Sequence, residues 1–430
     1  MKMKISHRGP QVFKKKRRGP WRIIATVVGC VLLVGIGYFS MKYIAEHPQS
    51  STLEPGETDI TNPSTETTGA DAGEPDTTSP STTTTTETPV AAGNASLLTG
   101  ENIRGFYLPA AVLSNTSTLD SLLEEAAEAG FNTAVFDLKD ENGVLHYVSA
   151  TDLAVQAGSA ADDALTLEEL KTLAQRMESK GITPLPRVFA FKDHTAPSTL
   201  MEARIGLENQ PGWMWLDNSK EAGGRPWLNP YSQQAQQYIT DLCVELKDAG
   251  FRGLILDGVQ FPNQQSQAYY GSGPLSSLSK GEVLSRFVSD LRQSVGAEDC
   301  AVLVASPGLS VFSDDTAPYY ANPLTFGETG ACPFLMPSTL GDPLNAGTES
   351  LSDPAAHPYD AVKLALNQIG LRLRLIEEDA PYICPWLQAY DYASRDITEQ
   401  IRAVTDVSGD NASYILYNPQ GTYDFAALTE

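Results

Sequence analysis

Acidic side chains stand at the ends of short apolar runs within residues 101–430 of this chain. The clearest case is GLILD, residues 253–257, in which glycine and aliphatic residues precede the carboxylate of Asp257. Such a run predicts a buried parallel strand, and α/β folds place their chemistry at the carboxyl ends of such strands. Other polar or aromatic side chains end this and similar runs: Asp137, Lys139, Asp140, Glu141, Arg187, Gln260, Trp386, Gln388, Asp391 and Asn418. Carboxylates paired across a cleft, beside aromatic platforms, are what hydrolysis of a glycosidic bond requires.

The elements that must position these side chains alternate regularly between apolar runs and amphipathic segments. The predicted strands are Gly105–Leu108, Thr133–Leu138, Thr183–Phe189, Gly253–Asp257, Ala301–Ser306, Cys332–Met336, Tyr382–Leu387 and Tyr414–Tyr417. The predicted helices are Leu119–Ala129, Leu167–Ser179, Tyr231–Ala249, Glu282–Val295, Tyr359–Ile376 and Asp396–Val407. This alternation implies a parallel sheet with right-handed crossovers, and its eight strands predict an α/β fold, a (β/α)8 TIM-type barrel over residues 99–430. An open doubly wound sheet is disfavoured because no glycine-rich nucleotide loop follows the first strand.

The first 98 residues predict three segments that precede the barrel. Residues 1–22 hold nine Lys or Arg and no acid, which predicts a basic cytoplasmic tail. Residues 23–44 contain an apolar run long enough to cross a bilayer, and because Ser40-Met41-Lys42 is a poor cleavage site, we expect a transmembrane signal anchor rather than a cleaved signal peptide. Residues 45–98 are rich in Thr, Pro and Glu, with nine acids and no Lys or Arg, which predicts a disordered linker. We therefore expect a single-pass protein of the cell membrane, in a bacterial cell-wall setting, with the barrel extracytoplasmic.

Charge and cysteine usage exclude several classes of partner. The formal net charge is −23 even though residues 1–22 contribute nine positive charges, so the barrel region is strongly acidic and unsuited to nucleic acid. His146, His194 and His357 are scattered and the cysteines have no metal-ligand spacing, so we expect no metal and no cofactor. Cys332 and Cys384 could lie on neighbouring strands and form a disulfide, but the pattern favours buried free thiols.

Four segments together resemble a known family. They are Phe131–Gly143 (FNTAVFDLKDENG), Gly250–Pro262 (GFRGLILDGVQFP), Phe334–Thr339 (FLMPST) and a C-terminal part formed by Pro385–Tyr390, Glu399–Ile401 and Tyr414–Tyr423. In this order they resemble the glycosyl hydrolase domain family with a (β/α)8 barrel distantly related to amylase-type barrels, over roughly residues 102–424. The resemblance implies a polysaccharide or cell-wall glycan as ligand, with Asp257 at the family's strand-end aspartate.

Two departures from the family pattern concern polar groups. Gln260 stands where the family's fourth strand has an arginine, and Met336 is followed directly by Pro337 where the family has a tyrosine. A neutral amide is a weaker donor to a substrate than a guanidinium. Either the substrate differs, or catalysis has been lost while binding persists.

Each candidate residue also has a purely structural interpretation. Asp257 could instead be an N-cap or pair with Arg187, and Asp137 and Lys139 could form a buried ion pair at the barrel mouth.

Three further alternatives concern turns and aromatic packing. Asp140 and Glu141 could be turn residues before Gly143. Trp386 could fill the core rather than stack on a sugar. Three tryptophans in the loop after the third strand could pack that loop down, which we favour, or form a sugar-stacking wall: Trp213, Trp215 and Trp227.

The sequence thus predicts a membrane-anchored, extracytoplasmic glycoside hydrolase-like protein acting on a cell-surface or environmental polysaccharide. Asp257 would be the nucleophile or base, and Asp140, Glu141 or Asp391 the acid. The expected substrate contacts are Asp137, Lys139, Arg187, Gln260, Trp386, Gln388 and Asn418. The alternative is a catalytically decayed barrel serving as a carbohydrate-binding module or a cell-wall scaffold. The lack of an acid at the end of the fifth strand, where amylase-like barrels place the proton donor, favours this alternative.

Overall fold

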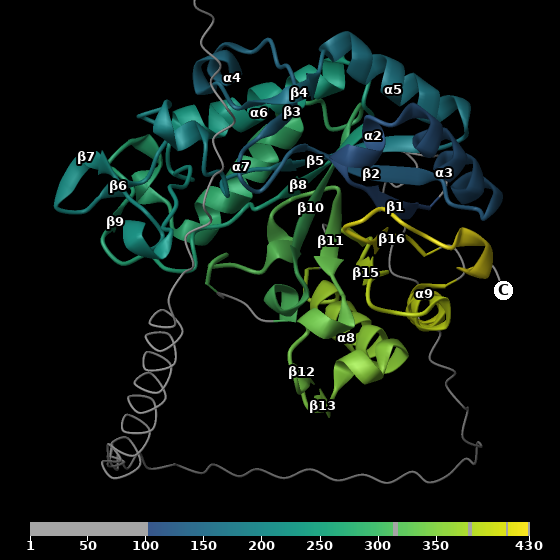
Figure 1. Cartoon of the computed structure of the whole chain (residues 1–430). Helices are drawn as coiled ribbons and strands as arrows, with labels where there is room; N and C mark the ends of the chain where they lie inside the picture. The colour runs from purple at the N-terminus through teal and green to yellow at the C-terminus, as the bar shows by residue number, and fades with distance from the viewer. Residues whose placement is uncertain (1–101, 313–316, 377–380, 410–411, 429–430) are drawn as a thin grey trace, which may run out of the picture. The chain divides into compact units, whose positions relative to one another are not determined.

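A closed ring of parallel strands organises the computed structural model, which describes residues 102–312, 317–376, 381–409 and 412–428. The strands are β1 (Arg104–Leu108), β2 (Thr133–Lys139), β5 (Thr183–Phe189), β8 (Gly253–Asp257), β10 (Ala301–Pro307), β11 (Gly330–Phe334), β15 (Trp386–Gln388) and β16 (Tyr414–Tyr417). Each pairs with the next, and β1 pairs with both β2 and β16, so the sheet has no free edge within the ring (Figure 1). The (β/α)8 barrel is confirmed.

The seventh strand is the one interrupted member of the ring. Its first part, β14 (Tyr382–Ile383), and its second, β15, both pair with β11. Pro385 lies between them and has no N–H to donate to a ladder, although its carbonyl still accepts from Ile415. The single predicted strand is therefore two short ones in the same direction.

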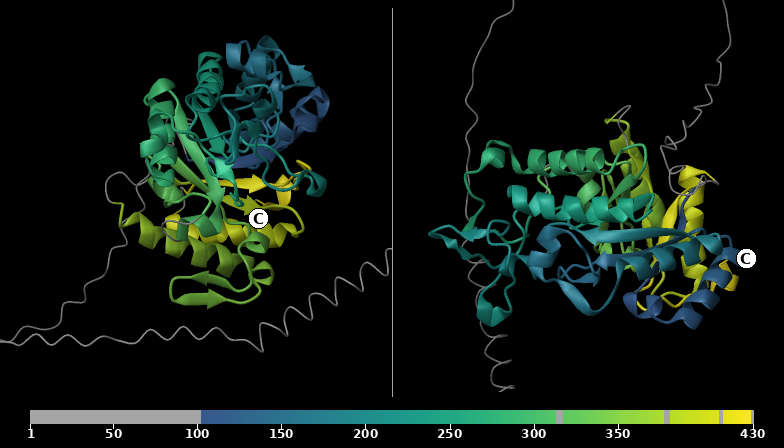
Figure 2. Two further views of the ribbon diagram at one scale, coloured as in Figure 1. Left: turned by 90° about the vertical axis from the view of Figure 1, so that its left-hand side faces the viewer. Right: turned by 90° about the horizontal axis from the view of Figure 1, so that it is seen from above.

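Helices follow most of the strands and lie outside them in both views of Figure 2. They are α2 (Ala110–Leu113), α3 (Thr116–Glu128), α5 (Leu167–Ser179), α6 (Gln233–Asp248), α7 (Lys280–Ser294), α8 (Pro358–Leu373) and α9 (Ser394–Ser408). Reciprocal capping boxes fix two of the starts, Thr166 with Glu169 on α5 and Ser279 with Glu282 on α7. Between β10 and β11 the described residues form only 3-10 turns.

Side chains alternate between the barrel interior and the layer under the helices. On β8, Leu254 and Leu256 join the large core shared with the helices, whereas Ile255 joins a separate interior cluster. That cluster is closed and mostly apolar: Ile103, Tyr107, Val135, Leu185, Ile255, Ala301, Leu303, Ala305, Cys332, Tyr382, Cys384, Trp386 and Ile415. Because the period is two, Asp257 faces the same interior as Ile255, at the carboxyl end of the ring.

Three excursions from the barrel were not predicted from the sequence. The first adds β3 (Leu145–Tyr147), α4 (Asp152–Ala157) and β4 (Ala160–Leu165) beyond β2, and the third is a hairpin of β12 (Leu344–Ala346) and β13 (Glu349–Leu351) beside α8 (Figure 1). Their strands are short; β4 is interrupted by two aspartates and has no fully buried residue, and β13 is mostly polar, so they lack the apolar runs that identified the barrel strands.

The second excursion is a small sheet that contains the tryptophans of the long loop. It joins β6 (Gly206–Leu207), β7 (Gln210–Met214) and β9 (Ala268–Tyr269) over its own core of Ile205, Trp215 and Trp227. The prediction that the tryptophans pack this loop is confirmed for Trp215 and Trp227. Trp213 differs, since it is 68% exposed on β7.

The predicted tail (1–22), signal anchor (23–44) and linker (45–98) lie outside the described residues. Among the helices that the structure describes, none is both long and apolar enough to span a bilayer. Cys243, Cys300, Cys332 and Cys384 are buried free thiols, as predicted, and Cys332 and Cys384 share a hydrogen bond inside the barrel. The described part of the chain holds no cluster of His, Cys, Asp or Glu that could hold a metal ion.

Candidate active site

A pocket of about 420 Å³ opens at the carboxyl ends of the barrel strands. Its lining is polar on the side of β2, β5 and β8 and apolar on the side of β10 and β11. The lining residues are Tyr107, Asp137, Asp140, Glu141, Asn142, Arg187, Phe189, Lys192, Asp257, Gly258, Gln260, Pro307, Phe334, Met336 and Tyr417. Six of the predicted site residues are brought together here, namely Asp137, Asp140, Glu141, Arg187, Asp257 and Gln260.

Arg187 is the central cation of this pocket and is only 7% exposed. Its Nε donates to Asp137 Oδ1 at 2.6 Å and its Nη2 to Asp137 Oδ2 at 3.0 Å. These two residues stand opposite each other in the pairing of β2 with β5, which makes the two-point contact possible. The guanidinium also lies over three aromatic rings at 5.0–5.3 Å: Tyr107, Phe189 and Trp386. Burial opposes the charge of Arg187, but Asp137 and Asp257 prevail and raise its pKa, so it stays a cation.

Both carboxylate oxygens of Asp137 accept hydrogen bonds within this network. Beyond the two bonds from Arg187, its Oδ2 accepts a hydrogen bond from the Tyr107 hydroxyl at 2.8 Å. Burial, and then the negative charge of Asp137, raise the pKa of Tyr107, which keeps the phenol protonated and donating. Asp137 therefore fixes Arg187 and Tyr107 rather than offering a free carboxylate to a ligand.

Asp257 is the pocket carboxyl whose acidity is most altered. It is 7% exposed; its Oδ1 accepts from the Gly258 N–H at 2.6 Å and its Oδ2 lies 3.4 Å from Arg187 Nη1. Burial raises its pKa to about 6, a shift that Arg187 and the Gly258 N–H only partly oppose. Gly258 has φ +61, and a Cβ on it would lie 3.0 Å from the Lys192 Cβ, so a glycine is required after this aspartate. A carboxyl with this pKa changes charge in the range that acid and base catalysts use.

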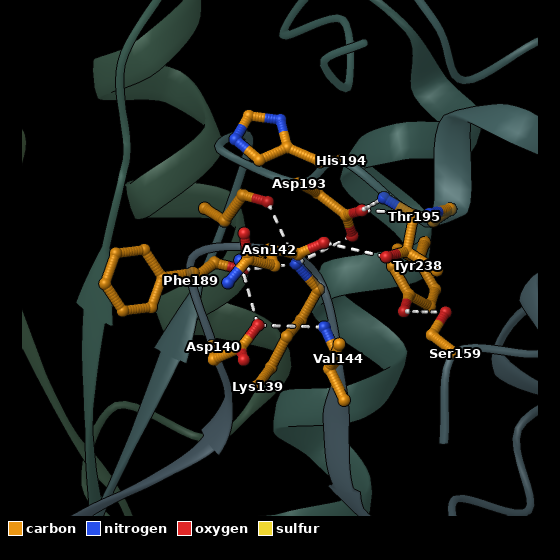
Figure 3. Close-up of polar contacts among 12 residues, drawn as sticks. Lys139, Asp140, Asn142, Val144, Ser159, Phe189, Asp193, His194, Thr195 and Tyr238 are labelled. Carbon is orange, nitrogen blue, oxygen red and sulfur yellow. Dashed lines mark hydrogen bonds and ion pairs between the residues drawn. The ribbon is translucent and has the colours of Figure 1, made fainter. Parts of the chain in front are cut away.

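Lys139 lies on the opposite side of β2 from Asp137 because of a bulge. The pairing with β5 places Asp137 opposite Arg187 but Lys139 opposite Val188, so one residue is extra and the alternation of faces is reversed. Lys139 is fully buried, with Nζ 2.8 Å from Asp193 Oδ2 and 2.7 Å from the Phe189 carbonyl oxygen (Figure 3). It therefore contacts neither a substrate in the pocket nor Asp137, which corrects both interpretations of this residue.

Asp140 is bound by the turn that follows β2. Its Oδ1 accepts from the N–H groups of Asn142 at 2.8 Å and Val144 at 3.0 Å, the second of which is drawn in Figure 3. Its Oδ2 is 3.6 Å from His146 Nε2. Burial works to raise the pKa of Asp140, but the hydrogen bonds from His146, Val144 and Asn142 outweigh it and leave the pKa lowered. These contacts support the alternative interpretation of Asp140 as a turn residue at the pocket edge over its assignment as the acid.

Glu141 and Gln260 complete the predicted residues of the pocket. The Glu141 side chain is 55% exposed and is held by one partner, Lys192 Nζ, at 2.5 Å. Gln260 lines the pocket, and its Oε1 accepts a hydrogen bond from the Tyr319 hydroxyl at 2.9 Å, which fixes the orientation of the amide.

The remaining predicted residues lie outside this pocket. Trp386 is fully buried beneath Arg187, which confirms the core-filling alternative. Gln388 is buried, with Oε1 accepting from the Ser338 N–H. Asn418 donates to the carbonyl oxygens of Ala389 and Thr422 and lines a second pocket together with Asp391. Asp391 does not share a pocket with Asp257, which corrects its pairing as the acid of the same site.

Several lining residues were not identified from the sequence. Tyr107 is two residues from Gly105 on the inward face of β1, and Phe334 ends a strand in the same way, so the alternation could have found them. Tyr417, which ends the eighth predicted strand, was expected at the barrel mouth and does line the pocket. Lys192 and Asn142 lie in loops, where no local pattern indicates the direction of a side chain.

The comparisons with known proteins identify the family of this chain. The model of the family described as "Putative glycosyl hydrolase domain" matches residues 105–423, and the chain belongs to this family. The predicted resemblance is confirmed. Among curated proteins, none matches the sequence.

Solved structures resemble this chain at low sequence identity. The glycoside hydrolase domain of PgaB (BpsB) from Bordetella bronchiseptica is 13% identical with a TM-score of 0.55, and the match covers 76% of this chain and 98% of that one. A hypothetical protein from Ruminiclostridium thermocellum is 20% identical with a TM-score of 0.39, over 46% of this chain and 96% of that one. A pneumococcal exo-beta-D-N-acetylglucosaminidase structure is 10% identical with a TM-score of 0.45, over 76% of this chain and 81% of that one. At this identity, the first of these establishes a common fold, and the active site must be argued from its own residues.

Proposed function

We propose that the protein is a glycoside hydrolase acting on a polysaccharide of the cell surface or environment, with Asp257 as nucleophile or base. The observation that carries this proposal is a buried carboxyl with a pKa of about 6 at the carboxyl end of a barrel strand, inside a pocket. Membership of a glycosyl hydrolase domain family supports a glycan as the ligand. Above its pKa, Asp257 is ionised and can attack a sugar carbon or accept a proton from water.

Glu141 is the residue we assign as the acid. Of the three acids weighed from the sequence, it alone lines the same pocket as Asp257 without being held by backbone N–H groups. Among the described residues its side chain pairs only with Lys192, whose flexible side chain can move away when a glycosidic oxygen arrives. A glutamate on the loop after β2 would then face Asp257 across the pocket, the relationship that a pair of hydrolytic carboxyls needs.

Arg187 and Gln260 would orient the sugar and the nucleophile. Arg187 donates to Asp137 with Nε and Nη2, and its Nη1 lies next to Asp257 Oδ2. It would therefore fix the position of the Asp257 carboxylate. Gln260 offers a neutral amide, which suits sugar hydroxyls better than a charged substrate group.

The proposed location is the cell membrane, with a single N-terminal span and the barrel outside the cytoplasm. It is supported by the sequence of residues 1–98, in which a basic segment precedes an apolar one and an acidic linker follows. A polysaccharide substrate fits that location because wall and capsule glycans lie on the same side of the membrane.

The test uses the full-length protein in detergent with cello-, chito- and malto-oligosaccharides. Parent, Asp257→Asn and Glu141→Gln are compared for the release of reducing ends, with Asp162→Asn, an exposed acid on β4, as the matched control. We expect cleavage by the parent and the control and at least a hundredfold loss in the other two. Cleavage that survives in Asp257→Asn would contradict the mechanism.

A glycan-binding module without catalysis is the second candidate. It is favoured by β10, which ends at Pro307 and gives no carboxylate to the described lining of the pocket. Oligosaccharide binding by the parent with no product on prolonged incubation would support this candidate over the first.

A further inference from the structure

A second pocket, of about 260 Å³, lies beside the first, over the ends of β15 and β16. Its polar lining includes Tyr390, Asp391, Ser394, Asn418, Gln420 and Asp424. This volume is below the roughly 300–1,000 Å³ of pockets for drug-sized ligands, so it suits a group the size of a single sugar ring.

Two contacts connect the lining of the first pocket to the lining of the second. Tyr417 lines the first pocket and Tyr390 the second, and their rings meet edge to face with centroids 6.1 Å apart. Tyr423 lines the second pocket and donates from its hydroxyl to the carbonyl oxygen of Tyr107, which lines the first. The rings of Tyr417 and Tyr390 therefore stand next to each other between the two pockets.

Asp391 has the character of a binding group rather than a structural one. It is exposed and held in the left-handed region at φ 58, and within the described residues its carboxylate has no hydrogen-bond or ion-pair partner. Non-glycine residues in this conformation gather at ligand sites, because the fold must hold them there. Ser394, the first residue of α9, lines the pocket next to an N-cap, Ala393, whose side chain cannot satisfy the helix N–H groups. Acceptors and donors therefore face the same cavity.

The charge of the lining selects the kind of ligand. Asp391 and Asp424 are its charged residues, and no Lys or Arg is among the described residues of the lining. Carboxylates accept hydrogen bonds from hydroxyl groups and repel other carboxylates, so an acidic sugar is disfavoured. The ring of Tyr390 adds the aromatic surface on which the C–H face of a sugar packs.

We propose that this second pocket is a subsite for a neutral sugar residue, so that one polysaccharide chain runs from the first pocket across Tyr417 and Tyr390 into it. The proposal rests on the proposed function and adds the substrate class, a neutral glycan longer than the first pocket can hold. Asp391 then binds substrate instead of taking part in the cleavage step.

The test measures how affinity depends on chain length. Cello- and chito-oligosaccharides from di- to hexasaccharide are titrated calorimetrically into the full-length protein, in the Asp257→Asn background, which prevents turnover. Asp391→Gly removes the carboxylate while suiting the left-handed backbone, and Tyr390→Ala removes the ring. Asp391→Asn, which tolerates the same backbone and keeps the shape of the side chain, is the matched variant. Thermal unfolding confirms that each variant is folded.

We expect the hexasaccharide of one series to bind more tightly than its disaccharide. Asp391→Gly and Tyr390→Ala should each weaken the binding of only the longer chains, by about tenfold. For Asp391 this is the effect of losing one hydrogen bond to a charged group. Asp391→Asn should lose less. The subsite would be overturned if affinity depended on chain length equally in the background protein and in both variants. It would also be overturned if affinity in the Asp257→Asn background did not depend on chain length at all. Either result would leave the function of the first pocket intact. A protein that neither binds nor cleaves any member of either series would overturn the neutral-glycan assignment of both pockets.

Discussion

Arg187 and Asp137 are joined by two parallel hydrogen bonds between β5 and β2, Nε to Oδ1 at 2.6 Å and Nη2 to Oδ2 at 3.0 Å. The same guanidinium reaches Asp257 only with Nη1, at 3.4 Å. One arginine thus interacts unequally with a half-buried carboxylate, Asp137, and a buried one, Asp257. Asp137 receives the strong interaction, and Asp257 is left with a charge that burial penalises and Arg187 only partly offsets.

Removal of the Arg187 guanidinium should destabilise the fold strongly. Arg187→Met leaves the half-buried Asp137 and the buried Asp257 without this cation, and we expect the free energy of unfolding to fall by about 3–5 kcal/mol. Arg187→Lys keeps the charge but loses the two-point geometry and the aromatic stacking, so its loss should be intermediate. Guanidinium unfolding followed by tryptophan fluorescence measures both. Arg286→Met, at a 58% exposed ion pair on α7, is the control and should change stability by less than about 0.5 kcal/mol. Equal losses for Arg187→Met and Arg286→Met would contradict this account.

The stability of the parent should depend on pH through Asp257. Its pKa is raised from an ordinary value of 3.8 to about 6, so the folded state binds this proton more tightly than the unfolded state does. Stability is therefore gained as pH falls from about 6 toward 4 and is lost again as pH rises, by up to about 3 kcal/mol for a shift of this size. Asp257→Asn does not titrate. The difference in unfolding free energy between parent and Asp257→Asn should therefore move in the parent's favour as the pH is lowered, and a difference independent of pH would argue against a raised pKa.

The pH dependence of activity should identify the role of Asp257. If it acts as nucleophile or base, it must be ionised, and kcat/KM on the best oligosaccharide should rise with pH through a midpoint near 6. Below this midpoint the rate should fall about tenfold per pH unit. Initial rates between pH 4 and pH 8 measure the profile, with Asp162→Asn as the control. A limb near 6 that falls with increasing pH would instead assign Asp257 as the acid.

The barrel was predictable because its strands are buried on both faces and so appear as uninterrupted apolar runs. The bounds of Thr183–Phe189, Gly253–Asp257 and Tyr414–Tyr417 agree with the structure. Asp257 and Arg187 followed from the same pattern, since a polar residue that ends such a run faces the barrel mouth.

The predictions that failed concern side chains whose direction depends on three-dimensional contacts, which the sequence pattern alone does not contain. The bulge that turns Lys139 away from the pocket results from pairing with β5, a strand that comes more than 40 residues later in the chain. Asp140 was misassigned because its turn hydrogen bonds form only when the loop closes toward Val144. Asp391 and Asn418 follow strands correctly, but their loop turns into the second pocket.

The bulge gives Lys139 a structural partner of its own. Asp193 is fully buried, 2.8 Å from Lys139 Nζ, and accepts from the N–H groups of Thr195 and Ala196 (Figure 3). A Cβ on Gly143, which has φ +84, would lie 2.0 Å from the carboxylate, so the turn after β2 packs directly on it. Lys139 also donates to the carbonyl oxygen of Phe189, a pocket residue. One ion pair therefore joins the two loops that carry Glu141 and Lys192.

Lys139 and Asp193 should consequently behave as a coupled pair in a double-mutant cycle. Lys139→Met leaves a buried carboxylate without its cation and should cost about 3–5 kcal/mol of unfolding free energy, whereas adding Asp193→Asn removes that charge and should recover part of the loss. Guanidinium unfolding of the four proteins gives the coupling, and the same cycle at Arg286 and Asp290, an exposed pair on α7, should give less than about 0.5 kcal/mol. The Lys139–Asp193 ion pair holds the loops that carry Glu141 and Lys192. The single variants should therefore also weaken oligosaccharide binding, although neither Lys139 nor Asp193 lines the pocket. Additive losses at Lys139 and Asp193 would show that the two loops are held by packing and not by the ion pair.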